Sequence, residues 1–182
     1  MNIMLHICCA PCSLYTIDKL KQDGHKVQGF FYNPNIYPSV EYKLRRQAVV
    51  DMAKRLNVDV TYGENWAIPA PAVELVKTDL NRGGWYGNQQ RCSNCWRMRL
   101  SETSKQAKVP QFDAFTTTLL ISPYQDHEKI KAIGAELEKE SRVNFYYDDF
   151  RIGFRQSQEM AKEQGVYRQK YCGCEQSITE KK

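Results

Sequence analysis

Seven cysteines in three short groups are the residues of this chain best suited to chemistry. Each group falls in a predicted loop or at the start of a predicted helix, where thiolates are stabilised and backbone N–H groups are free. Cysteines that served only as small apolar residues would be scattered through strands and helix faces. The grouping therefore predicts a metal–thiol or redox site. The groups are Cys8, Cys9 and Cys12, then Cys92 and Cys95, and finally Cys172 and Cys174.

Two metal chemistries suit these thiols. A structural zinc site takes four ligands, usually as two close pairs, and would use Cys92 and Cys95 with one further group. That choice leaves three of the seven thiols unexplained. An iron–sulfur cluster takes four thiolates on four different irons, so the adjacent Cys8 and Cys9 can both contribute. The most economical cluster ligands are Cys8, Cys9, Cys92 and Cys95.

A thiol redox pair is the third chemistry, and it fits the C-terminal group. Gly173 relieves the tight ring that a disulfide between Cys172 and Cys174 would need, and nearby basic residues would lower a thiol pKa. Such a pair is compatible with a cluster in one enzyme. Cys12 remains, and either holds a second metal together with Cys172 or Cys174 or packs against the first helix.

The first cysteine group is predicted to lie in a turn between a strand and a helix. Residues 2–7 read as a short buried strand, and residues 14–21 place apolar side chains at helical spacing. Pro11 suits the first turn of that helix. In open α/β sheets, ligands bind at the carboxyl ends of the strands, and a helix N-terminus there favours anions such as thiolates. We therefore expect the metal site at this edge of the sheet.

The rest of the chain alternates between strand and helix patterns, which predicts an α/β fold with a parallel sheet of about five strands and flanking helices. Ser39 is expected to cap the second helix, whose apolar stripe runs from Leu44 to Leu56. A glycine-rich connection at 82–91 is a candidate lid. We expect one domain over residues 1–182, with a cysteine-bearing C-terminal tail. Further strands are predicted at 26–32, 58–62, 114–120 and 144–147, and further helices at 39–56, 72–80, 92–108, 128–140 and 156–164.

Positive charge is concentrated in one stretch. The chain carries a net charge of +5, and between Arg82 and Lys108 six basic residues face a single acidic one. Three aromatic residues are interleaved there, a mixture that suits a nucleic-acid backbone and unstacked bases. Arg91, Arg97 and Arg99 are the candidate RNA contacts. The alternative is a solvated helix face with a few anchoring aromatics.

The expected compartment is the cytoplasm. The sequence holds no apolar run long enough to span a membrane, and its N-terminus lacks the pattern of a secretory signal. Structural disulfides are rare in the cytoplasm, where clustered thiols more often indicate metal or redox chemistry.

Five motifs carry a resemblance to a known family. The sequence resembles the cobalamin-independent epoxyqueuosine reductases, the QueH family, over nearly the whole chain. The resemblance implies a Rossmann-like fold of the adenine-nucleotide hydrolase (HUP-like) type, a [4Fe–4S] cluster, and reduction of epoxyqueuosine to queuosine at the wobble position of tRNA. In that family, the position of Cys12 can instead hold aspartate. The motifs are Cys8 to Ser13, Tyr32 to Ile36, Arg91 to Leu100, Thr116 to Pro123 and Tyr167 to Cys174.

The implied reaction assigns roles to several residues. Removing an epoxide oxygen to leave an alkene takes two electrons and two protons, and a cluster supplies electrons one at a time. A dithiol or a second iron nearby would hold the other electron, and an unidentified donor would replenish both. His6, Tyr32 or Asp149 is the candidate proton source. The alternatives are a hydrogen-bonded histidine at a strand end for His6 and a helix cap for Asp149.

A second function from another class stays open at this point. A zinc-stabilised RNA-binding module without redox activity would use the same basic stretch and one set of four thiols. The surplus of thiols beyond four, above all Cys172 and Cys174, favours the reductase.

Overall fold

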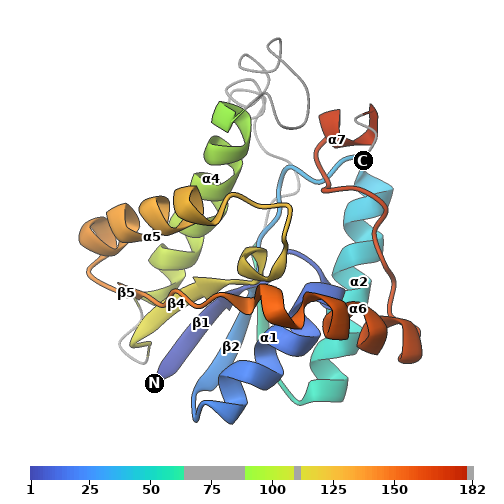
Figure 1. Cartoon of the computed structure of the whole chain (residues 1–182), viewed down its shortest axis with the longest axis horizontal. Helices are drawn as coiled ribbons and strands as arrows, with labels where there is room; N and C mark the ends of the chain where they lie inside the picture. Colours follow the sequence, from blue (N-terminus) through green and yellow to red (C-terminus); the bar gives the residue numbers. More distant parts are fainter. Residues whose placement is uncertain (64–88, 109–111, 180–182) are drawn as a thin grey trace.

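A single parallel sheet organises the chain in the computed structural model, which describes residues 1–63, 89–108 and 112–179. The predicted helix at 72–80 and most of the predicted lid at 82–91 lie outside these ranges. The strand order is β3-β2-β1-β4-β5, and all pairings are parallel (Figure 1). This confirms the predicted fold class. The strands are β1 (Asn2–His6), β2 (Lys26–Phe31), β3 (Val60–Tyr62), β4 (Ala114–Thr117) and β5 (Asn144–Phe145).

The strand β1 lies in the middle of the sheet because both of its faces are apolar. Ile3 and Leu5 are fully buried and Met4 is 3% exposed, as expected for a central parallel strand. Leu5 is in register with Gly29 of β2 and with Thr116 of β4. The loop that follows β1, which carries the first cysteines, therefore emerges between the ends of two neighbouring strands.

Helices cover both faces of this sheet. The helix α1 packs against α2 and α6, whereas α4 packs across β1 and β4 with α5 beside it. Connections between parallel strands are right-handed as a rule, which puts these two groups on opposite faces. The helices are α1 (Ala10–Gln22), α2 (Ser39–Leu56), α4 (Gln89–Ala107), α5 (His127–Ser141), α6 (Phe154–Glu163) and α7 (Gln176–Thr179), with 3-10 turns η1 (Thr118–Ile121) and η2 (Phe150–Gly153).

Three local predictions were wrong. Pro38 occupies the N-cap of α2, so Ser39 is the first helical residue and makes no cap. Leu44 is 45% exposed, although Val49 and Met52 of the same predicted stripe are buried as expected. The strand predicted at 114–120 ends at Thr117, whose Oγ1 accepts the Leu119 amide and turns the chain into η1.

None of the helices in the described ranges combines the length and the apolar composition that crossing a membrane requires.

Candidate metal centre

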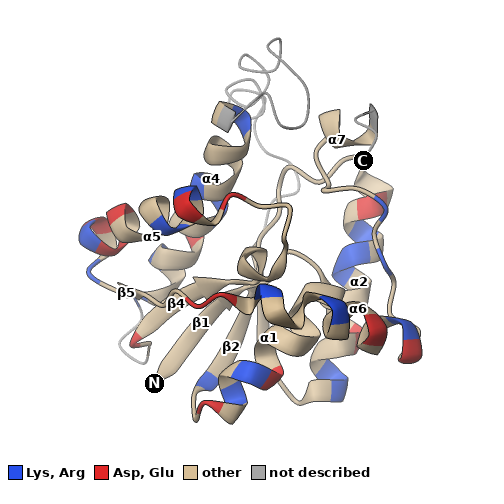
Figure 2. Cartoon of the chain, in the orientation of Figure 1, with Lys and Arg blue, Asp and Glu red and all other residues tan. Residues whose placement is uncertain are grey.

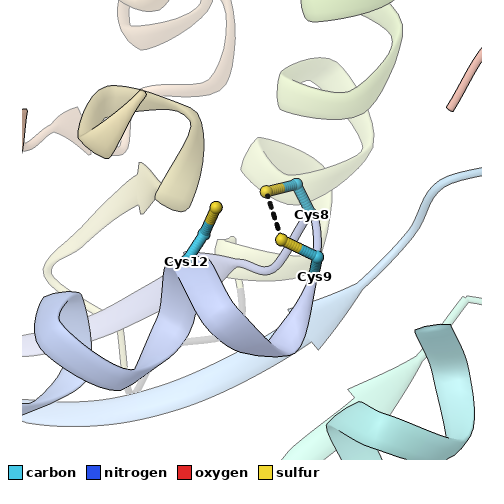
Figure 3. Close-up of side chains that lie close together, drawn as sticks. All are labelled: Cys8, Cys9 and Cys12. Carbon is cyan, nitrogen blue, oxygen red and sulfur yellow. Dashed lines mark hydrogen bonds between the residues drawn. The ribbon is translucent and has the colours of Figure 1, made fainter. Parts of the chain in front are cut away.

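Three thiols converge at the carboxyl end of β1. The sulfur atoms of Cys8, Cys9 and Cys12 all lie within 4.8 Å of one another, and Figure 3 shows them clustered at the start of α1. Cys9 is the extended N-cap of α1, and Pro11 lies in the first turn of the helix as predicted. Three sulfurs this close can share one metal ion, and soft thiolates select iron or zinc. Cys12 thus belongs to this group by position.

Hydrogen bonds to sulfur come from three different parts of the chain. Thr118 Oγ1 donates to Cys8 Sγ at 3.2 Å, and the Gln169 side-chain amide donates to Cys9 Sγ at 2.8 Å. The third donor is the Asn35 amide, which reaches Cys95 Sγ at 3.2 Å. Such donors stabilise thiolates and tune the potential of a thiolate-bound metal.

The helix α4 turns the second cysteine group and two arginines toward the same region. Arg91, Cys92, Cys95 and Arg99 recur at the three- and four-residue spacing that places side chains on one helix face. Arg91 is 4% exposed and Arg99 only 2%. Burial by itself lowers the Arg99 pKa, but nearby thiols, Cys95 first among them, outweigh it and raise that pKa. Arg99 is therefore a buried cation beside the thiols.

This placement changes the interpretation of the basic stretch. A guanidinium must be exposed to contact a phosphate, and the structure buries Arg91 and Arg99. Arg97 alone of the three points outward, 43% exposed and ion-paired with Glu136 and Glu140 of α5. Figure 2 shows residues of both charges on α5, the helix that carries these two glutamates. The sequence argument treated every arginine as exposed, whereas the periodicity of α4 divides them between two faces.

The first and third cysteine groups line one cavity. Its volume is about 120 Å³, and the residues that line it include Cys8, Cys12, Cys172, Arg45 and Arg99. All seven cysteines are free thiols. The C-terminal segment therefore folds back over the first loop, although the two are more than 150 positions apart in sequence. The hydrogen bond from Gln169 to Cys9 also shows this.

The protonation of these thiols is uneven. Hydrogen bonds with Cys12 and then Cys9 lower the pKa of Cys8, whereas hydrogen bonds with Cys8 and then Cys9 raise the pKa of Cys12. Burial, and then the neighbouring Cys95, raise the pKa of Cys172 to about 12. One thiolate in the first group is thus favoured before any metal binds, while Cys172 stays protonated at neutral pH.

The three candidate proton donors differ in surroundings. His6 is fully buried between Thr117 Oγ1 at 2.9 Å and the Tyr32 carbonyl at 3.1 Å, and burial lowers its pKa to about 4. Asp149 caps η2 and pairs with Arg151, a contact that lowers its pKa to about 2. His6 is therefore neutral and Asp149 ionised at neutral pH. Burial raises the Tyr32 pKa, so the Tyr32 hydroxyl keeps its proton.

Three polar residues of the centre, Thr118, Gln169 and Arg45, were missed by sequence reasoning. Thr118 and Gln169 lie inside the motifs that carry the family resemblance, and this was the available signal. Their hydrogen bonds to sulfur depend on tertiary contacts that a linear pattern does not reveal. Arg45 sits four residues after Glu41 on α2, a spacing that suggests a surface ion pair, yet Arg45 is only 2% exposed.

Comparison with known proteins gives one consistent family. The chain is 36% identical to the epoxyqueuosine reductase QueH of Thermotoga maritima over 190 residues, which covers 100% of this chain and 92% of that protein. It is 35% identical to the same-named protein of Staphylococcus aureus, covering 95% of this chain and 74% of that protein. The QueH of Dehalococcoides mccartyi is 31% identical, with 95% and 90% covered.

A solved structure supports the fold. The crystal structure of a predicted subunit of tRNA methyltransferase from Methanocaldococcus jannaschii matches with a TM-score of 0.57 and 14% identity, covering 90% of this chain and 75% of that one. At this identity the likeness concerns the fold alone. The sequence model of epoxyqueuosine reductase QueH matches residues 3–180, so the chain belongs to the epoxyqueuosine reductase QueH family.

Proposed function

We propose that this chain is an oxidoreductase that reduces epoxyqueuosine to queuosine at the wobble position of tRNA. The observation that carries the proposal is the meeting of Cys8, Cys12 and Cys172 on one cavity at the carboxyl end of β1. In the reaction both C–O bonds of the epoxide break and a C=C bond forms. The oxygen leaves as water, which takes two electrons and two protons. Thiols and thiolate-bound metals are the groups here that supply electrons.

For the metal, we propose a [4Fe–4S] cluster held by Cys8, Cys9, Cys92 and Cys95. The donor set fits such a group because three of these sulfurs accept a side-chain hydrogen bond. Arg99 adds a buried positive charge, which offsets the negative charge of a thiolate-bound cluster. A cluster at this position would supply electrons one at a time.

The remaining thiols offer two ways to complete the supply of two electrons. Cys12 and Cys172, which line the same cavity, would ligate a second, mononuclear iron. Alternatively, Cys172 and Cys174 form a redox pair, in which two S–H bonds break and one S–S bond forms as two electrons and two protons leave. An external electron donor then restores the dithiol. Tyr32 is the remaining proton donor among the three proposed, because its hydroxyl is protonated at neutral pH.

For tRNA binding, the candidate phosphate contact among Arg91, Arg97 and Arg99 is Arg97. Its ion pairs to Glu136 and Glu140 are exposed and therefore weak, so a phosphate can compete for its guanidinium. The described elements all belong to one sheet and its covering helices, which supports a single domain that carries both the tRNA contact and the thiols.

The decisive experiment is a single-turnover assay under anaerobic conditions. Protein reconstituted with iron and sulfide is reduced with dithionite and mixed with tRNA that carries epoxyqueuosine, and the nucleosides are then analysed by mass spectrometry. We expect the modified nucleoside to lose one oxygen atom. Protein with Cys8→Ser and protein depleted of metal are the controls that should show no conversion.

The zinc-module alternative predicts a different result from the same preparation. Iron–sulfur protein is brown, whereas zinc protein is colourless. A colourless protein that binds tRNA with full affinity, and leaves the nucleoside intact, would show that the reductase proposal is wrong.

A further inference from the structure

The two peptide groups between the last two cysteines are each held from elsewhere in the chain. Arg45 Nη1 donates to the Cys172 carbonyl at 2.9 Å. The Tyr37 amide donates to the Gly173 carbonyl at 2.8 Å, and the Gly173 amide donates to Ser177 Oγ at 3.1 Å. These bonds exist while both cysteines are free thiols. They therefore fix the backbone of the dithiol form.

Arg45 reaches this loop from a buried network on α2. Its Nε donates to Glu41 Oε1 at 2.7 Å, and Tyr167 donates its hydroxyl to Glu41 Oε2 at 2.5 Å. A further bond runs from Arg45 Nη2 to the Tyr171 carbonyl at 3.0 Å. Arg45 is 2% exposed and Glu41 is 6% exposed. All three nitrogens of the guanidinium are engaged, so its planar fork is held in one orientation.

Gly173 is adapted to this guanidinium. Its φ of +128° is a conformation that other residues rarely adopt, and a Cβ there would lie 2.9 Å from Arg45 Nη1. Glycine thus allows both the turn and the close approach. The C-terminal segment runs alongside α2 in Figure 1, which brings the loop to the helix that carries Arg45.

A disulfide across this loop would place its own demand on the same two peptide groups. Cysteines two positions apart are bridged only when their sulfurs meet at bonding distance with a Cβ–S–S–Cβ dihedral of about 90°, and the short ring that results restricts how the peptide groups between them are oriented. The Cys172 carbonyl belongs to one of those groups and the Gly173 carbonyl to the other. Bonds that hold both groups in place therefore favour the dithiol over the disulfide.

We propose that Arg45 is a positioning residue that stabilises the dithiol form of Cys172 and Cys174, an inference that rests on the proposed redox role of this pair. On oxidation two S–H bonds break, one S–S bond forms, and two electrons and two protons pass to the acceptor. During turnover the acceptor is the epoxide. Because the dithiol is favoured, an external donor restores it more readily after each turnover.

The test is a redox titration of the metal-loaded protein in mixtures of reduced and oxidised dithiothreitol. Oxidised dithiothreitol takes up the two electrons and two protons. Alkylation followed by mass spectrometry of the C-terminal peptide gives the ratio of dithiol to disulfide. Arg45→Lys keeps the charge but not the fork, and the double variant Glu41→Gln/Arg45→Gln avoids a buried unpaired carboxylate.

We expect the double variant to shift the dithiol–disulfide equilibrium toward the disulfide by roughly tenfold or more, since hydrogen bonds from a charged donor are lost. The dithiol–disulfide equilibrium of Arg45→Lys should lie between those of the double variant and the wild type. The matched control is Arg46→Gln, because Arg46 stacks over the Tyr62 ring at 4.5 Å instead of contacting the loop. Iron content reports whether each variant has folded.

Two outcomes would overturn the proposal. One is an equilibrium constant that is the same in the wild type and in both Arg45 variants, and the other is a pair that never oxidises across the titration. The proposed redox role is tested separately through turnover of Cys172→Ser and Cys174→Ser. Normal turnover in both, with a wild-type pair that titrates and shifts as expected, would reject the redox role while leaving the effect of Arg45 intact.

Discussion

Arg99 donates two hydrogen bonds to Asn35 Oδ1, at 3.3 Å from Nε and 2.8 Å from Nη2. The same Asn35 side chain donates through Nδ2 to Cys95 Sγ at 3.2 Å. The buried cation thus fixes which end of the amide faces the sulfur, because only the amide nitrogen can donate. This relationship connects Arg99 to the thiol site and not to an RNA surface.

Arg99→Gln should therefore weaken metal binding. The variant loses a buried positive charge and releases the amide that donates to Cys95, and loss of such outer partners typically costs roughly 10–100-fold in metal affinity. Iron retained per chain under increasing concentrations of a chelator measures the effect. Arg97→Gln, on the exposed face of the same helix, should retain iron as the wild type does. Equal retention in both variants would contradict the role given to Arg99.

The reverse pattern is expected for tRNA binding. Arg97→Gln should reduce the log–log slope of affinity against salt concentration by about 0.7–0.9, the change for one lost phosphate contact. Arg99→Gln should leave that slope unchanged, since its guanidinium is buried. Binding measured over a series of potassium chloride concentrations tests both variants together. If Arg97→Gln keeps the wild-type slope, the phosphate contact lies elsewhere.

The sequence predicted the order of strands and helices because alternating apolar segments specify a parallel sheet almost by themselves. It also predicted a metal–thiol site, because the three cysteine groups can be read directly from the linear order of residues. The division of arginines on α4 was missed, since charged residues are ordinarily exposed and only tertiary packing showed that Arg91 and Arg99 face inward. The exposure of Leu44 has a similar origin: helical spacing gives a stripe, but the neighbouring elements decide which edge of it is buried.

Gly29 provides a test of the packing that holds the centre in place. A Cβ at this position of β2 would lie 2.6 Å from Ile7 Cδ1 and 2.9 Å from Val60 Cγ2. Ile7 is fully buried just before Cys8, so it has no room to move away. Gly29→Ala should lower the free energy of unfolding by about 1–3 kcal/mol, as overpacked cores do. Urea denaturation measures this loss of stability. Gly165→Ala is a poor control, because the φ of Gly165 is +62°, which alanine rarely adopts.

A more suitable comparison for Gly29→Ala is Gln47→Ala on the exposed face of α2, where no buried contact is lost. An unfolding free energy of Gly29→Ala equal to that of the wild type would show that Ile7 and Val60 can yield, and that the strand spacing beside the cysteine loop is less constrained than the structure indicates.

His127 should make the protein less stable at acid pH. Burial lowers its pKa below the ordinary 6.5, Arg151 adds to this effect, and Asp149 and Glu128 oppose it. Its ring also contacts the Tyr147 hydroxyl at 3.4 Å. Because the folded pKa is the lower one, the unfolded chain binds more protons in this range. The free energy of unfolding therefore falls as the pH drops through 6.5.

His127→Gln removes that proton linkage while keeping a polar side chain. Urea denaturation at several pH values between about 7 and 5 should show a smaller loss of stability in the variant than in the wild type. Parallel curves for the two proteins would mean that His127 does not titrate differently on folding.

Cys12 distinguishes between the two proposals for the electron supply, a second iron and a redox pair of thiols. Its sulfur lies within 4.8 Å of those of Cys8 and Cys9, and it lines the cavity that Cys172 also lines. If Cys12 and Cys172 ligate a second iron, then Cys12→Ser should lose that iron while keeping the visible absorption of the cluster, whereas Cys8→Ser should lose the absorption of the cluster. Iron analysis combined with absorption spectra of the anaerobic proteins separates these results. Full iron content in Cys12→Ser would remove Cys12 from the ligands, and the two-electron pair of Cys172 and Cys174 would then remain of the two proposals.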